Sequence, residues 1–128
     1  MKKSIITLCM VIMMFVLVAC GGNKVDESTA DHYIKEAEKI IDLLNDGNYE
    51  ETHSNFDENM KSQLPVEDME ELTEIIEEAG KFSEISKASV EEKDDLYVTV
   101  LVAKYSAKKL VFTITLDEND KVAGLYIK

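Results

Sequence analysis

Two histidines and many carboxylates are the side chains of this chain that could perform acid–base or metal chemistry. His32 and His53 are the only histidines in the sequence. A zinc site needs ligands that converge on one point, and these two lie far apart on different predicted helices. Neither shows the short ligand spacing of a zinc motif. We therefore interpret both as surface or partly packed residues and predict no metal-ligating residue.

The densest group of acids follows Pro65, the single proline of the chain. Its members are Glu67, Asp68, Glu70, Glu71, Glu74, Glu77 and Glu78. Calcium needs carboxylates gathered by a loop, whereas carboxylates along a helix splay apart, so we predict a solvated helix face. The stretch from Asp117 through Glu118 and Asn119 to Asp120 has the composition of a hairpin turn. It lacks the spacing and the glutamate of a calcium-binding loop.

Motifs for covalent or cofactor chemistry are missing from the sequence. No serine stands in a nucleophile elbow, and no glycine-rich loop is arranged to hold a phosphate. We therefore predict no catalytic residue, no cofactor-binding residue and no cofactor. The aromatic residues either line a ligand pocket or fill the core, and these are Tyr33, Tyr49, Phe56, Phe82, Tyr97, Tyr105, Phe112 and Tyr126.

Cys20 ends a short apolar segment that follows two lysines. A helix over residues 5–18 would be roughly 21 Å long, which is short of a ~30 Å hydrocarbon core and typical of a secretory signal. The residues Leu17, Val18, Ala19 and Cys20 resemble the bacterial lipobox. The resemblance implies that diacylglycerol alkylates Cys20, that the chain is cut before it, and that its new amine takes a further acyl chain such as palmitate. Several acyl chains give stable membrane anchoring.

These features divide the chain into a lipoprotein signal peptide (residues 1–19), a lipidated tether (20–28) and one domain (29–128). We expect a protein that is lipid-anchored at the extracytoplasmic face of the cell membrane. The alternatives are a plain cleaved signal with a chance cysteine, and an uncleaved anchor.

The composition of the chain excludes several classes of partner and site. The 128 residues carry a net charge of −12. Without Lys2 and Lys3, twelve lysines face 26 acids, which gives −14. Such an acidic chain is not suited to bind nucleic acid, because phosphates require a basic surface. Because Cys9 is expected to leave with the signal and Cys20 to be lipidated, we expect no cysteine to remain for a disulfide or a cysteine-based metal site.

The first half of the domain has apolar residues at helical spacing. Glycines after Asp46 and Ala79 mark helix ends. The expected helical stretches are Ser28–Leu44, Asn48–Phe56, Asp57–Leu64 and Pro65–Ala79.

The second half changes to the alternation that is typical of β-strands. The expected strands are Glu84–Glu91, Leu96–Tyr105, Leu110–Leu116 and Lys121–Ile127. Helices followed by a meander predict an α+β fold, in which the N-terminal helices pack on a curved four-stranded antiparallel sheet.

Four short pieces carry a resemblance to a known family. They are Asp46–Tyr49, Phe56–Pro65, Gly80–Phe82 and Val122–Leu125. In this order they resemble a small bacterial domain family of unknown function. Its cone-shaped fold is similar to cystatin and to nuclear transport factor 2. The family often precedes an α/β-hydrolase in secreted proteins and also occurs alone on lipoproteins, and the likeness covers Ile34–Ile127.

Two functions remain open from the sequence. The first is a non-enzymatic, membrane-tethered domain that binds an envelope protein, a small ligand or a second copy of itself. The second is a small-molecule pocket protein with isomerase-like chemistry, which would need polar groups that converge inside the cone.

Overall fold

The computed structural model describes residues Asn23–Lys128. The predicted signal peptide and Cys20 lie outside the described residues. None of the helices within this range is both long and apolar enough to cross a bilayer.

The domain places its helices before its sheet, as the sequence predicts. The helices are α2 (Glu27–Asn45), α3 (Tyr49–Ser54), α4 (Glu58–Gln63), the 3-10 helix η1 (Val66–Met69) and α5 (Glu70–Ala79). The strands are β1 (Asn23–Lys24), β2 (Phe82–Lys93), β3 (Leu96–Tyr105), β4 (Lys109–Leu116) and β5 (Val122–Ile127).

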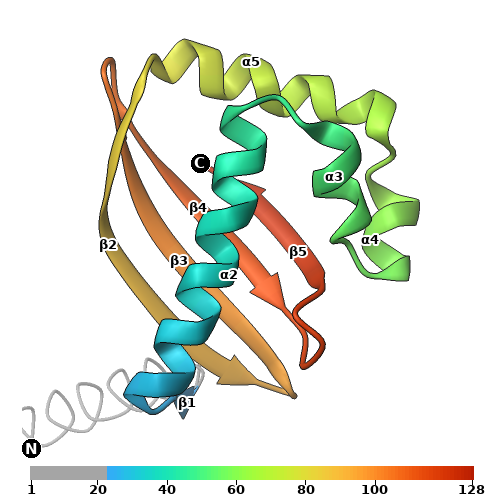
Figure 1. Cartoon of the computed structure of the whole chain (residues 1–128), viewed down its shortest axis with the longest axis vertical. Helices are drawn as coiled ribbons and strands as arrows, with labels where there is room; N and C mark the ends of the chain where they lie inside the picture. Colours follow the sequence, from blue (N-terminus) through green and yellow to red (C-terminus); the bar gives the residue numbers. More distant parts are fainter. Residues whose placement is uncertain (1–22) are drawn as a thin grey trace, which may run out of the picture.

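The sheet is antiparallel, and its strands lie in the order in which they occur along the chain. Helix α2 runs diagonally across one face, while α5 crosses one end and α3 and α4 lie beside β5 (Figure 1). The other face of the sheet carries no helix of the described chain (Figure 1). The predicted α+β class is therefore confirmed.

The strand count and the start of the domain differ from the sequence prediction. The sheet has five strands, because Asn23 and Lys24 pair with Glu92 and Glu91 of β2. These two residues were expected in a tether, but backbone pairing does not require an apolar pattern. Helix α2 follows at Glu27, so little of the expected tether remains outside the fold.

Helix boundaries follow local capping chemistry. Asp57 caps α4, because its Oδ1 accepts a hydrogen bond from the Met60 amide at 2.8 Å. Asp26 precedes α2, and hydrogen bonds from Ser28 and then Thr29 lower the pKa of its carboxyl group. Pro65 does not open an α-helix as predicted. It precedes the 3-10 turn η1, and regular α-helix begins only at Glu70.

Apolar side chains fill the space between the helices and the sheet. Ala37 and Ile41 of α2 are fully buried against Leu101, Phe112 and Ile114 of the sheet. Within the described chain, the buried polar residues are Thr52 and Thr99, and neither carries a charge. The carboxylates of the described residues therefore lie at the surface, and none lies inside this core.

Candidate functional site

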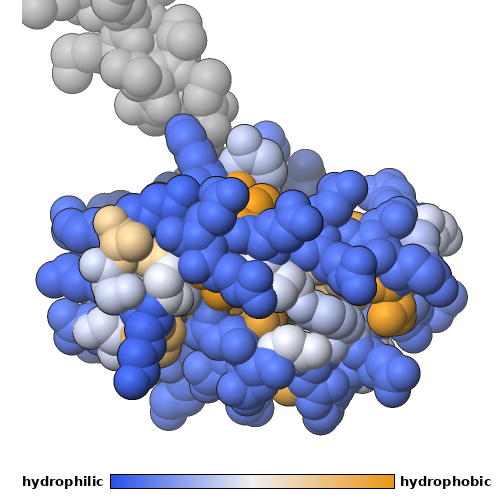
Figure 2. All heavy atoms as spheres, turned by 90° about the horizontal axis from the view of Figure 1, so that it is seen from above, coloured by the Kyte–Doolittle hydropathy of each residue, from blue (hydrophilic) through white to orange (hydrophobic). Residues whose placement is uncertain are grey.

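The acidic residues after Pro65 form the solvated face that the sequence predicts. All seven are exposed along η1 and α5. Figure 2 looks onto the molecule from the side of α5 and shows a mostly hydrophilic surface with small, separate apolar spots. These carboxylates belong to none of the clusters of possible metal ligands found in Asn23–Lys128.

The structure places the two histidines in separate surroundings. The ring of His53 packs on Phe56 with centroids 5.5 Å apart, and its Nε2 lies 3.4 Å from the carbonyl oxygen of Lys61. His32 is exposed near the start of α2. Each histidine thus has a different partner, Asp120 for His32 and the Lys61 carbonyl for His53.

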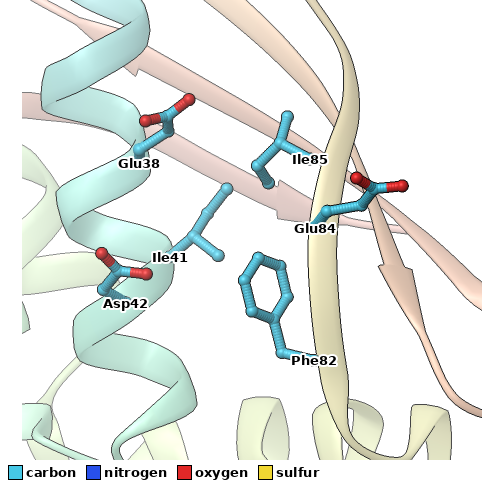
Figure 3. Close-up of a pocket in the computed structure, with 6 residues that line it drawn as sticks. All are labelled: Glu38, Ile41, Asp42, Phe82, Glu84 and Ile85. Atoms are coloured by element: carbon cyan, nitrogen blue, oxygen red, sulfur yellow. The ribbon is translucent and has the colours of Figure 1, made fainter.

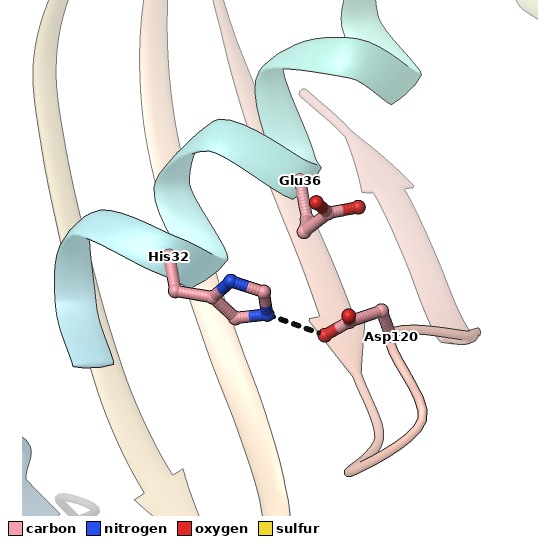
Figure 4. Close-up of side chains that lie close together, drawn as sticks. All are labelled: His32, Glu36 and Asp120. Carbon is pink, nitrogen blue, oxygen red and sulfur yellow. Dashed lines mark hydrogen bonds and ion pairs between the residues drawn. The ribbon is translucent and has the colours of Figure 1, made fainter. Parts of the chain in front are cut away.

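His32 is instead part of a cluster with Glu36 and Asp120 that no pattern in the sequence reveals. Its Nε2 lies 2.7 Å from Oδ1 of Asp120, and Glu36 lies one helical turn further along α2 (Figure 4). One ligand atom from each residue lies within 4.8 Å of the other two. The spacing of His32 and Glu36 is a helical i, i+4 signal, but nothing in the sequence joins them to Asp120.

The turn between β4 and β5 fixes the position of Asp120. Oδ1 of Asp117 accepts hydrogen bonds from the backbone amides of Asn119 at 2.8 Å and Lys121 at 2.9 Å. Asp120 adopts a φ of 61°, a left-handed conformation that aspartate tolerates better than most residues. The predicted hairpin turn is confirmed, and it also aims one carboxylate at α2.

Lys39 balances part of the negative charge at this cluster. Its Nζ lies 2.9 Å from Oε1 of Glu36. The hydrogen bond and charge of Glu36, with a smaller contribution from Asp120, raise the pKa of Lys39. A groove of about 350 Å³ adjoins the cluster, and it is lined by residues that include Glu36, Lys39 and Asp120.

A second groove of about 320 Å³ lies between α2 and β2. Ile41, Phe82 and Ile85 point into it from its two walls (Figure 3). Phe82 and Ile85 are three positions apart, so regular alternation would put them on opposite faces of the strand. The irregular register of β2 between Phe82 and Glu84, and again after Ile85, turns both toward α2.

Carboxylates surround the apolar floor of this α2–β2 groove. Glu38 and Asp42 stand on the α2 side, whereas Glu84 extends across β2 and away from the helix (Figure 3). Glu84 also lies 3.6 Å from Nζ of Lys104, and both side chains are largely exposed. The groove therefore combines an apolar floor with a negative rim on its α2 side.

The aromatic residues proposed as pocket lining are mostly packed. Phe56 and Phe112 are buried, and Tyr33 stacks on Tyr97 with ring centroids 4.0 Å apart. Burial is the main cause that raises the pKa of Tyr33 to about 12. Tyr126 is the exception, since it is 63% exposed. The core interpretation of the aromatic residues therefore accounts for most of them.

The uncovered face of the sheet is the apolar surface that an interaction domain would need. It carries half-buried side chains from β3 and β4, namely Val98, Val100, Val102, Val111, Thr113 and Thr115. A shallow hollow of about 420 Å³ lies over its β2–β3 part, next to Lys87. Nothing at this face selects a particular partner.

Comparisons with known proteins support the fold and the family. A search of curated proteins found no match. An NMR structure of a protein from Ruminococcus gnavus superposes with a TM-score of 0.67 and 22% identity, covering 82% of this chain and 96% of that one. This likeness shows a shared fold. Residues 37–125 match the profile of a family described as "Protein of unknown function (DUF3887)". The match lies within the range Ile34–Ile127 of the expected resemblance, and the chain belongs to the DUF3887 family.

Proposed function

We propose that this chain is an extracytoplasmic lipoprotein, anchored in the cell membrane through Cys20, whose domain binds a partner protein without catalysis. The lipobox-like residues before Cys20 support the anchoring. The arrangement of helices on one face of an antiparallel sheet supports the expected kinship with the cone-shaped cystatin-like and nuclear-transport-factor-2-like folds.

The α2–β2 groove is the single observation that carries the binding function. Its apolar lining offers burial to an apolar side chain, because Phe82 and Ile85 are only half-buried there, beside the fully buried Ile41. Glu38 and Asp42 on its rim attract a cation. The occupant is therefore a protein segment in which lysine or arginine flanks a large apolar residue.

The size of the groove favours a side chain over a larger ligand. Its volume of about 320 Å³ is at the lower end of the roughly 300–1,000 Å³ typical of small-molecule pockets. Isomerase-like chemistry would require an acid in an enclosed site, and the acids at this groove stand on its rim. A basic envelope protein is therefore the preferred partner class over a small ligand.

Peptide binding to the full-length chain in detergent micelles tests this proposal. The probes are three synthetic peptides: leucine flanked by lysines, leucine flanked by glutamates, and serine flanked by lysines. We expect the first peptide to shift the NMR signals of Ile41, Phe82 and Ile85 most strongly. It alone combines an apolar side chain for the apolar lining of the groove with positive charges for its acidic rim. Equal binding of the lysine- and glutamate-flanked leucine peptides, or shifts away from the groove, would contradict the proposal.

A charge-reversal pair sharpens the test. Glu38→Lys with Asp42→Lys should weaken binding of the lysine-flanked leucine peptide about fivefold, since two exposed charge pairs contribute roughly 1 kcal/mol together. Glu67→Lys with Glu71→Lys is the matched control, because it makes the same charge change at the same spacing on exposed residues of η1 and α5. If the control pair weakens peptide binding equally, the loss comes from the net charge of the protein and not from the position of Glu38 and Asp42.

A further inference from the structure

We propose that His32, Glu36 and Asp120 form a binding site for one divalent transition-metal ion, with zinc as the representative ion. This inference concerns a different part of the surface from the α2–β2 groove. It holds or fails independently of the proposed partner binding.

The three ligand atoms already lie close to the separation that a metal requires. They lie within 4.8 Å of one another, and His32 Nε2 and Asp120 Oδ1 are 2.7 Å apart. Zinc–nitrogen and zinc–oxygen bonds of about 2.0–2.2 Å in a tetrahedron place neighbouring ligand atoms roughly 3.4 Å apart. Side-chain adjustments of about 1 Å would bring these atoms to that spacing.

Both elements of the site are held in place before a metal arrives. His32 and Glu36 project from the same side of α2, and the Asp117-centred turn presents Asp120 to them (Figure 4). The ring of His32 also packs edge-on against Tyr33, with centroids 4.9 Å apart. A site with its ligands already oriented loses less side-chain entropy on binding.

The ligand set selects the kind of ion. One imidazole and two carboxylates suit zinc and similar first-row ions, whereas magnesium and calcium prefer oxygen ligands only. Two ionised carboxylates balance a charge of +2. Lys39 shares the Glu36 carboxylate and acts as an outer partner that orients it, a role that hydrogen-bonded groups around metal ligands commonly perform.

Three protein ligands leave a tetrahedral ion one further position. Glu36 and Asp120 also line the groove of about 350 Å³ between α2 and α3. A water molecule or a ligand atom in that groove could complete the coordination. The site therefore resembles an exchangeable metal site more than a closed structural one.

Zinc titration of the full-length chain in detergent, followed by calorimetry, tests the site. We expect one equivalent of zinc to bind, and we expect His32→Ala and Asp120→Asn each to weaken it at least about 100-fold, because loss of an outer partner alone costs 10–100-fold. Asparagine tolerates the left-handed conformation of residue 120, so that variant keeps the turn. Glu36→Gln removes the third carboxylate or imidazole ligand and should also weaken zinc binding.

Two substitutions serve as matched controls. His53→Ala removes the other histidine, and Glu118→Gln removes a neighbouring carboxylate of the same turn. Both should keep zinc affinity within about twofold, and circular dichroism should show that every variant is folded. Cobalt provides a second readout, because nitrogen–oxygen coordination lacks the intense thiolate charge-transfer bands that Cys9 or Cys20 would give. No zinc binding, binding unchanged by His32→Ala and Asp120→Asn, or thiolate bands would overturn the proposal.

Discussion

The hydroxyl group of Tyr105 donates a 2.6 Å hydrogen bond to Oδ1 of Asn45, which joins the end of β3 to the last residue of α2. The Tyr105 ring is buried and packs edge-on against Phe82 at the neighbouring strand. Nδ2 of Asn45 has no hydrogen-bond partner, so the bond from Tyr105 satisfies only the carbonyl oxygen of the Asn45 side chain. This contact fixes the end of α2 against the sheet.

Tyr105→Phe should lower the free energy of unfolding by about 1–2 kcal/mol, because it leaves the carbonyl oxygen of Asn45 without a donor. Urea denaturation measures the change. The double variant Tyr105→Phe with Asn45→Leu should lose less than the sum of its two single changes, since both polar partners are then gone. Additive losses would show that the hydrogen bond contributes little.

Alkaline pH should destabilise the wild-type domain through the same residue. Burial raises the pKa of Tyr105 to about 12, against 10.0 in an unfolded chain. Between these values the unfolded chain releases a proton that the folded domain keeps, so stability falls as pH rises. The contribution is complete below pH 10, and about 2 kcal/mol is lost by pH 12.

Comparison with Tyr105→Phe isolates this effect, because Tyr33 also has a pKa of about 12 and titrates in both proteins. Denaturation curves across this range should show the stability gap between the two proteins narrowing. A gap that stays constant from pH 10 to 12 would contradict the prediction.

Gly80→Ala should be strongly destabilising, by about 2–4 kcal/mol. Gly80 ends α5 with a φ of 96°, which L-residues avoid, and an added Cβ would lie 2.1 Å from Oγ of Ser106. Moving Ser106 would also break its 2.9 Å hydrogen bond from the Lys81 amide. Thermal unfolding measures the loss.

Two comparison variants separate the causes of this loss. Ser106→Ala removes only the hydrogen bond and should cost about 1 kcal/mol. Gly47→Ala also replaces a positive-φ glycine, but an added Cβ there meets nothing closer than 3.9 Å, so its cost should be smaller. Equal losses for Gly47→Ala and Gly80→Ala would exclude the close approach to Ser106 as a cause.

Asp57→Ala should destabilise the domain by about 1 kcal/mol, because it removes the side-chain cap of α4. Asp57→Asn is the matched control, since asparagine caps helices about as well as aspartate. The backbone hydrogen bond from Asp57 to the Val122 carbonyl remains in both variants. Similar losses in the two variants would indicate a role for the charge in place of the cap.

Cys20→Ala should abolish the incorporation of labelled palmitate and release the chain from the membrane fraction. Cys9→Ala is the control and should leave both unchanged, because Cys9 lies within the predicted signal peptide. Labelled lipid on the Cys20→Ala chain would contradict the lipoprotein prediction.

Strong local patterns made several elements predictable. Strand β3 has the predicted bounds, Leu96–Tyr105, because this run is rich in β-branched and aromatic residues, which favour strands. Gly80 ends α5 as predicted. Strand β2 was predicted two residues short at each end, since Phe82 and Lys93 lie outside its alternating part.

Features that depend on distant partners could not be predicted. The two-residue strand β1 exists because β2 offers it an open edge. The irregular register of β2 turns Phe82 and Ile85 toward the same side of the strand, and the sequence does not show where this irregularity occurs. The contact between His32 and Asp120 spans 88 positions along the chain. Only the packing of α2 across the sheet determines that the turn lies beside this helix.

The pairing of β1 with β2 has a consequence for how the anchored domain would stand on a membrane. Only Gly21 and Gly22 separate Cys20 from β1 in the sequence, and an extended chain of this length spans at most roughly 10 Å. The end of the sheet that holds β1 and the Asp94–Asp95 turn would face the headgroups, and α5, at the opposite end, would face outward (Figure 1). With the anchor at Cys20, the edge strand would orient the domain so that its acidic α5 face points away from the membrane.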